Sequence, residues 1–167
     1  PTTISATEDV ASDVDLSGLS LADVDAADTA GGEIALTLEV DAGTLAATGN
    51  GDVAVAGAGT DSLTLTGTVA DLNGFLGDAA AVQYTSALNA NGNGAATLTL
   101  SANEQGNSGT GVVLGSAGID IAAVNDDPTA TGVPTTISAT EDVASDVDLS
   151  GLSLADVDAA DTAGGEI

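Results

Sequence analysis

The chain has 167 residues with 26 Asp and Glu and no Lys, Arg or His, so every charged side chain is negative. It cannot form side-chain salt bridges, and nucleic acid is a disfavoured partner because proteins bind phosphates through Lys and Arg. No Cys is present for a disulfide, and no apolar run reaches the length of a membrane span. The expected counter-charge is therefore a cation, and a metal is the remaining strong stabiliser for a core with only two aromatic residues.

Residues 1–34 reappear without a change at residues 134–167. The offset of 133 residues is an ordinary size for one all-β domain, so we expect a tandem array. The predicted domains are one full repeat at residues 1–127 and the N-terminal part of the next identical repeat at residues 128–167. The second part is too short to bury a core alone, so it either continues into a further repeat or docks on a neighbour.

Alternation of apolar and polar residues runs along most of the first repeat and predicts β-strands. Stretches rich in Gly, Asn and Asp separate them and predict turns. Short strands at this spacing favour an antiparallel β-sandwich. The predicted strands are residues 33–40, 52–57, 62–68, 81–86, 95–101 and 118–124.

One segment departs from the two-residue period. The sequence TVADLNGFLG at 68–77 places Leu72, Phe75 and Leu76 at helical spacing and ends at Gly77. We expect one or two helical turns there, closing an edge of the sandwich with Leu72 and Phe75 buried; an irregular loop is the alternative.

Acidic residues gather in three clusters near the junction between the copies. The first is VNDDP at 124–128, the second is TED at 7–9 and 140–142, and the third is DVDAAD at 23–28 and 156–161. Ca²⁺ takes six to eight oxygen ligands, which clustered carboxylates and an Asn carbonyl can supply. The candidate ligands are Glu8, Asp9, Asp23, Asp25, Asp28, Asn125, Asp126, Asp127, Glu141, Asp142, Asp156, Asp158 and Asp161. The alternative is that these acids are solvated turn residues, since Asp and Asn favour turns.

The order of these clusters resembles the cadherin repeat, with an acidic linker, an x-Glu-x element and an Asp-x-Asp element. In more detail the chain is similar to the cadherin-like and Ig-like repeats of giant RTX-type bacterial surface adhesins. VNDDP at 124–128, ATED at 6–9 and VADLN at 69–73 carry the resemblance. It implies an Ig-like or cadherin-like sandwich in tandem repeats, extracellular location at the bacterial surface after type I secretion, and rigidification by Ca²⁺.

The resemblance also implies a role for each acid. Glu8, residues 125–127, Asp156 and Asp158 would hold the junction inside this chain. Glu141 would serve the following junction, and Asp23 and Asp25 the preceding one. A further mid-domain acidic motif of cadherins has no match, although Asp61 or Asp120 could substitute for it, so the number of ions per junction stays open.

Three functions remain to be weighed. The main hypothesis is an extender repeat of a large adhesin that projects a distal adhesive domain, in contact with adjacent repeats of its own chain. The alternative is a subunit of an extracellular filament or surface layer whose C-terminal segment pairs with a neighbouring chain. A glycan- or ligand-binding module is a third possibility. We expect no enzyme, because the chain has no His or Lys to act as a base.

Overall fold

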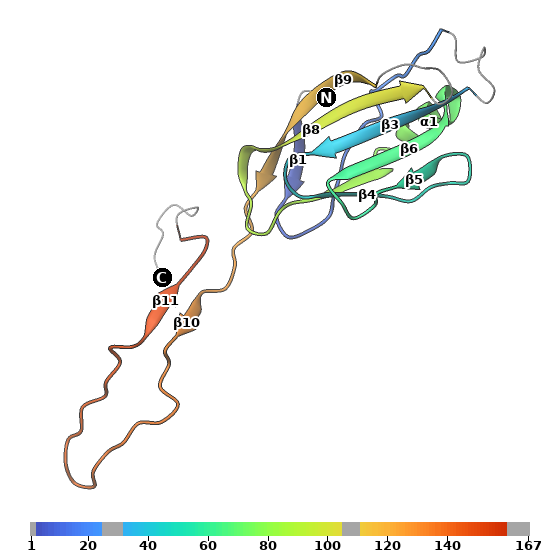
Figure 1. Cartoon of the computed structure of the whole chain (residues 1–167). Coiled ribbons are helices and arrows are strands. Elements are labelled where there is room, and N and C mark those ends of the chain that lie inside the picture. The colour runs from blue at the N-terminus through green and yellow to red at the C-terminus, as the bar shows by residue number, and fades with distance from the viewer. Residues whose placement is uncertain (1–2, 25–31, 105–110, 160–167) are drawn as a thin grey trace. The chain divides into compact units, whose positions relative to one another are not determined.

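The computed structural model describes residues 3–24, 32–104 and 111–159 (Figure 1). The chain forms two units, Pro1–Val124 and Asn125–Ile167, which we call unit 1 and unit 2. Over the described residues the fold is all-β with one short helix, and that helix is far too short to cross a membrane.

Nine of the described strands belong to unit 1. A six-stranded sheet has the order β1-β9-β8-β3-β6-β5, and a three-stranded sheet has the order β2-β7-β4. The bounds are β1 (Thr3–Thr7), β2 (Ser12–Asp13), β3 (Glu33–Val40), β4 (Thr44–Ala47), β5 (Ala54–Ala56), β6 (Ser62–Thr68), β7 (Val82–Thr85), β8 (Gly92–Glu104) and β9 (Val112–Ala122).

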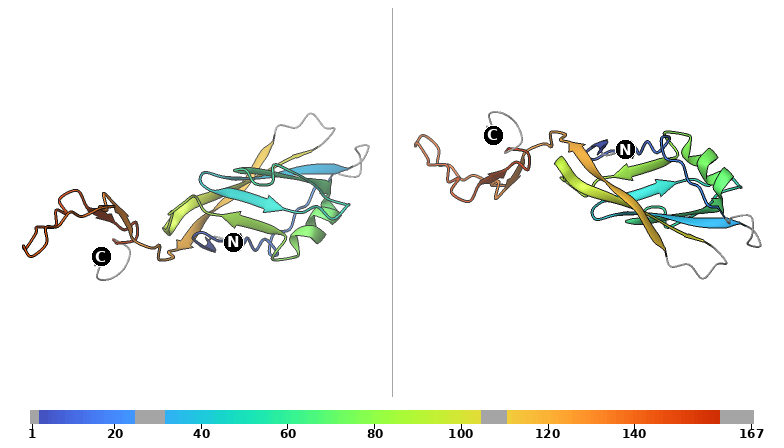
Figure 2. Two further views of the ribbon diagram at one scale, coloured as in Figure 1. Left: turned by 90° about the horizontal axis from the view of Figure 1, so that it is seen from below. Right: turned by 90° about the horizontal axis from the view of Figure 1, so that it is seen from above.

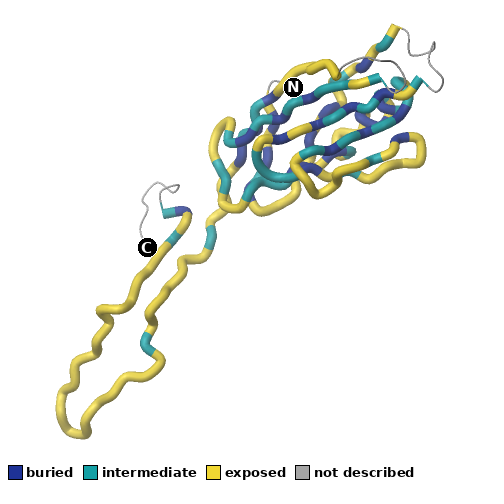
Figure 3. The backbone as a smooth tube through the Cα atoms, viewed as in Figure 1, coloured by how far each residue is buried: buried dark blue, intermediate teal, exposed yellow. Residues whose placement is uncertain are grey.

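The alternating pattern explains how the sheets make a core. In β3 the side chains of Ile34, Leu36, Leu38 and Val40 are buried, while the residues between them are exposed or half-buried. Successive side chains of a strand point to opposite faces, so one face of β3 is apolar and packs inward. Buried residues from both sheets belong to a single hydrophobic cluster. Figure 3 shows these buried positions in dark blue along the strands of unit 1.

The helix α1 (Val69–Leu76) confirms the helical prediction. Thr68 caps it, accepting a hydrogen bond from the Asp71 N–H, and its hydroxyl donates to the Asp71 carboxylate at 2.6 Å. Leu72, Phe75 and Leu76 are buried, as expected for an apolar face at helical spacing. The helix lies at the end of unit 1 opposite to the end of β9 (Figures 1 and 2).

The strand predictions need three corrections. First, β1 pairs with β9 in parallel, so the ladders are not all antiparallel. Second, β9 begins at Val112 instead of residue 118. The first half of β9 has no alternation of buried and exposed residues, since Val112, Val113 and Leu114 are all exposed, and its sequence therefore lacks the two-residue period. Third, the short strands β1, β2 and β4 had not been predicted; two to five residues give little periodic signal.

Over residues 125–159, unit 2 contains one two-stranded ladder, in which β10 (Thr129–Thr131) pairs antiparallel with β11 (Ser153–Ala155). Most of its other described residues have no regular structure and are exposed, as the yellow tube in Figure 3 shows. Unit 2 begins at Asn125, within the VNDDP segment.

Candidate metal-binding carboxylates

Among the described residues of unit 1, Glu8 has the most deeply buried carboxylate. It directly follows β1, its backbone N–H donates to the Ala122 carbonyl at 3.0 Å, and its side chain is 0% exposed. One carboxylate oxygen, Oε2, accepts hydrogen bonds from the Val124 N–H at 3.1 Å and from the Asn91 side chain at 3.4 Å. The other oxygen, Oε1, is buried without a hydrogen-bond partner among the described residues. A buried carboxylate is costly unless a partner satisfies it, and this chain has no basic side chain to do so.

Asp9, the residue after Glu8, contributes to the structure through its backbone conformation. Its φ angle is 60°, in the left-handed region that Asp tolerates better than most residues. The exposed Asp9 side chain belongs to the turn after β1, where the Thr7 N–H donates to the Ser12 hydroxyl at 3.0 Å. This turn holds Glu8 at the end of the β1–β9 ladder.

In the described part of unit 2, Asp158 is the buried carboxylate, with 3% of its surface exposed. Its Oδ2 accepts a short hydrogen bond from the Asp126 N–H, and its own N–H donates to the Asp156 carboxylate at 2.9 Å. Its Oδ1 has no hydrogen-bond partner within the described part of the chain. The Asn125 side-chain amide donates a hydrogen bond to the Asp126 carbonyl at 2.8 Å, so Asp126 is hydrogen-bonded through its carbonyl as well as its N–H.

Asp23 lies at the other end of β9 from Glu8. It lines a cavity of about 340 Å³ together with Glu104 and Val112, the first residue of β9, whereas Glu8 contacts the last residue, Ala122. Glu104 was not predicted from the sequence, because it does not belong to any of the short acidic motifs. The register Ile34↔Glu104 brings it to this end, and no short-range pattern reports such a register.

The remaining predicted ligands are exposed, half-buried or outside the described residues. Asn125, Asp127, Glu141 and Asp142 are exposed, and Asp156 is half-buried, as is Asp126. Asp25, Asp28 and Asp161 lie outside the described residues. The sequence analysis also missed Asn91, whose side chain contacts Glu8 from 83 positions away.

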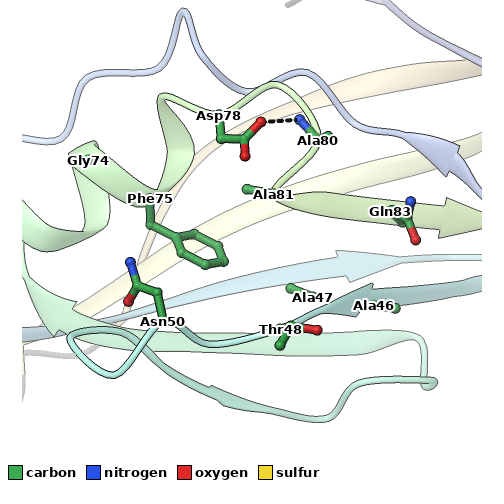
Figure 4. A pocket seen from close by; sticks show the side chains of 10 residues that line it. All are labelled: Ala46, Ala47, Thr48, Asn50, Gly74, Phe75, Asp78, Ala80, Ala81 and Gln83. Carbon is green, nitrogen blue, oxygen red and sulfur yellow. Dashed lines mark hydrogen bonds between the residues drawn. The ribbon is translucent and has the colours of Figure 1, made fainter.

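The largest cavity that we describe in unit 1 lies beside α1, has a volume of about 560 Å³ and is lined partly by Phe75, Asn50 and Gln83 (Figure 4). The Asp78 carboxylate on its wall accepts a hydrogen bond from the Ala80 N–H at 3.0 Å. Much of the remaining lining is Ala. The single acid of this wall is thus engaged in a turn, and the cavity gathers no group of carboxylates.

Glu8, Asp126 and Asp158 are candidates for holding a metal ion. Their carboxylate oxygens suit a hard cation such as Ca²⁺. Searches with the chain against protein-family models, curated proteins and solved structures gave no match.

Proposed function

We propose that this chain is a Ca²⁺-rigidified extender repeat of a large bacterial cell-surface adhesin, exported from the cell and projecting a distal adhesive domain. The adhesin-like motifs of the sequence support this, as does the all-β fold. We further propose that the six-stranded and three-stranded sheets of unit 1 form an Ig-like or cadherin-like sandwich, since their buried residues share one core.

The observation that carries the proposal is the Glu8 carboxylate, fully buried with one oxygen unpartnered among the described residues. In a chain without basic residues, a bound cation is the direct way to compensate such a charge. Oxygen-rich surroundings favour Ca²⁺ over softer metals. The cation would also reduce the mutual repulsion of 26 acidic residues, which destabilises a compact state.

The hydrogen bonds of the two units suggest how one ion could serve both. The Val124 N–H binds Glu8, and the Asp126 N–H binds Asp158. These two N–H groups are two residues apart, so the backbone keeps them within about 7 Å of each other. We propose that an ion bound by Glu8, Asp126 and Asp158 stiffens the connection at this point. Asp23 and Glu104, at the other end of β9, would take the same part in a preceding junction.

The first test is thermal unfolding with Ca²⁺ and with excess chelator. A ligand that binds only the folded state stabilises it by about 2.7 kcal/mol per site at a hundredfold excess over its dissociation constant. We expect the melting temperature to fall on chelation. Glu8→Gln together with Glu141→Gln should lose much of this response, because neither copy then supplies the carboxylate, whereas Glu141→Gln alone should keep it. The two positions are matched, because the surrounding 34 residues are identical. An unchanged melting temperature in chelator would reject the proposal.

The second test is the stiffness of the connection, measured by small-angle scattering during a Ca²⁺ titration. The wild-type profile should sharpen to that of a rod. Asp127→Asn and Asp156→Asn should each require more Ca²⁺, because each removes a charge near the proposed ion. If both leave the titration unchanged, the ion is elsewhere and the cadherin-like assignment of these residues is wrong.

A subunit of an extracellular filament is the second candidate. The observation in its favour is the exposure of apolar residues in unit 2, including Ile137 at 56% and Leu154 at 54%. These side chains could pair with a neighbouring chain. Light scattering in Ca²⁺ separates the candidates, because the filament subunit should form long assemblies and the extender should remain a monomer.

A further inference from the structure

Residues 3–24 occupy a slot at the edges of both sheets of unit 1. In the six-stranded sheet, β1 covers the edge of β9, with Ile4 opposite Ile119 and Thr7 opposite Ala122. In the three-stranded sheet, β2 pairs with β7. We call the surface formed by the edges of β9 and β7 the edge slot.

The occupant contributes both core side chains and hydrogen bonds. Ile4, Val14, Leu16 and Leu21 are all at most 8% exposed. The Val14 N–H donates to the Val82 carbonyl at 2.8 Å. The Asn73 side chain accepts from the Leu21 N–H at 2.8 Å and donates to the Leu21 carbonyl at 2.9 Å. Unit 1 is therefore incomplete without a segment of this sequence.

The chain carries that sequence twice. Residues 136–157 repeat residues 3–24 at every position. In unit 2 the apolar side chains that would fill the edge slot are exposed: Ile137 by 56%, Val147 by 53%, Leu149 by 50% and Leu154 by 54%. The second copy thus has all the groups that the slot binds, and it leaves the apolar ones in contact with water.

We propose that residues 136–157 can replace residues 3–24 in the edge slot of the same molecule, so that unit 1 exists in two connectivities. In the exchanged form Ile137 takes the place of Ile4, and residues 3–24 are released. Within the edge slot the two forms bury the same side chains and make the same hydrogen bonds, because the two occupants are identical. The exchanged form gives up the ladder of β10 with β11, since β11 lies within residues 136–157.

The connection between the slot and the second occupant is long enough. Thirteen residues, 123–135, join the end of β9 to Thr136. Thr136 would lie opposite Gly118, as Thr3 does. The chain must therefore return over four residues of strand, about 13 Å, and move sideways by about 4.8 Å. Thirteen residues can span about 43 Å, and a dozen residues is the usual minimum for joining parallel strands.

Exchange within one molecule is favoured over exchange between molecules. A connection of this length gives the second occupant an effective concentration of about the millimolar range, far above that of a dilute protein solution. The first occupant is attached through residues 25–32 and the second through residues 123–135. The difference in loop-closure entropy between connections of these lengths changes the equilibrium constant between the two forms by only about twofold.

The test uses matched substitutions in the two copies of the full chain. The first-copy variant is Ile4→Asp with Leu16→Asp, the second-copy variant is Ile137→Asp with Leu149→Asp, and the quadruple variant has all four. Each places charges where the slot requires apolar side chains. Urea unfolding of all variants is followed by circular dichroism in one Ca²⁺-containing buffer, and molar mass is measured by light scattering.

We expect the first-copy and second-copy variants to keep a cooperative unfolding transition as monomers, because each retains one intact occupant. The quadruple variant should lose the transition. If the first-copy variant unfolds like the quadruple variant, the second copy does not enter the slot and the proposal is wrong. Rescue only as a dimer would also overturn it, since the exchange would then be intermolecular.

A disulfide trap tests the exchanged register directly. The chain has no Cys, and Ser5 lies opposite Asp120 in the β1–β9 ladder. In the first-copy variant, Asp120→Cys with Ser138→Cys should form an intramolecular disulfide under mild oxidation. Asp120→Cys with Ser5→Cys in the second-copy variant is the control for the original connectivity. If the control cross-links and the 120–138 pair does not, the exchanged form is absent.

Discussion

Two stretches of this molecule have the same sequence and different surroundings. In unit 1, Ile4 is 5% exposed and Leu16 is 2% exposed; in unit 2, Ile137 is 56% exposed and Leu149 is 50% exposed. Residues 3–7 form β1, whereas residues 136–140 form no strand. Residues 153–155 form β11, whereas the identical residues 20–22 do not. Strand formation and burial in these stretches depend on which partners lie nearby.

The turns behave differently, because they are the same in both copies. Asp9 and Asp142 have φ angles of 60° and 58°. The Thr7 N–H donates to Ser12 at 3.0 Å, and the Thr140 N–H donates to Ser145 at 3.1 Å. These bonds join residues at most five positions apart, so the local sequence is sufficient to specify them.

The largest predicted effect separates the buried copy from the exposed one. Leu149→Ala should change the free energy of unfolding by less than about 0.5 kcal/mol, since its side chain is half exposed. Leu16→Ala together with Leu149→Ala should cost about 2–5 kcal/mol, because no intact Leu remains to fill the core position. Urea unfolding measures both values. A cost of about 2–5 kcal/mol for Leu149→Ala alone would show that Leu149 is also a core residue.

The same distinction explains how much of the fold could be predicted from the sequence. Alternation in Glu33–Val40 and helical spacing around Leu72 are short-range patterns, and both elements were predicted correctly. The parallel pairing of β1 with β9 joins residues more than a hundred positions apart. Nothing in the TISAT sequence of β1 marks that partner, and the same sequence in unit 2 forms no strand.

The candidate site follows the same rule. Glu8, Asp126 and Asp158 were predicted as ligands because they lie in short acidic motifs. The sequence could not distinguish buried Glu8 from exposed Glu141, because their surroundings in sequence are identical. Asn91 and Glu104 were missed, since only strand pairing and packing bring them near Glu8 and Asp23.

A smaller effect is expected at Asn73, whose side chain bonds to both backbone groups of Leu21. Asn73→Ala should lower the free energy of unfolding by about 1–3 kcal/mol, because it leaves a part-buried N–H and carbonyl without these partners. Asn103→Ala, at an exposed position of β8, is the control and should have little effect. If Asn73→Ala is as mild as the control, the Asn73 bonds do not help to hold residues 3–24 in the edge slot.

The smallest predicted effect concerns the turns that both copies share. The Ser17 hydroxyl donates to the Asp15 carboxylate at 2.6 Å and the Ser17 N–H donates at 2.9 Å, and these bonds lower the pKa of Asp15. Hydrogen bonds from the Ser150 hydroxyl and N–H likewise lower the pKa of Asp148. A lowered pKa in the folded state contributes stability above the unfolded-state pKa, and this contribution is lost as the pH falls through the folded-state pKa.

Both carboxylates should therefore titrate below the ordinary Asp value of about 3.9 in an NMR pH titration. Ser17→Ala should raise the pKa of Asp15 and leave Asp148 unchanged, and Ser150→Ala should do the reverse, because each hydroxyl acts only on the carboxylate two residues before it. The two titrations also test the local half of the comparison. If the pKa of Asp15 is lowered while that of Asp148 is ordinary, the turn at Asp15 needs the packing of unit 1. The local sequence alone would then not specify this turn.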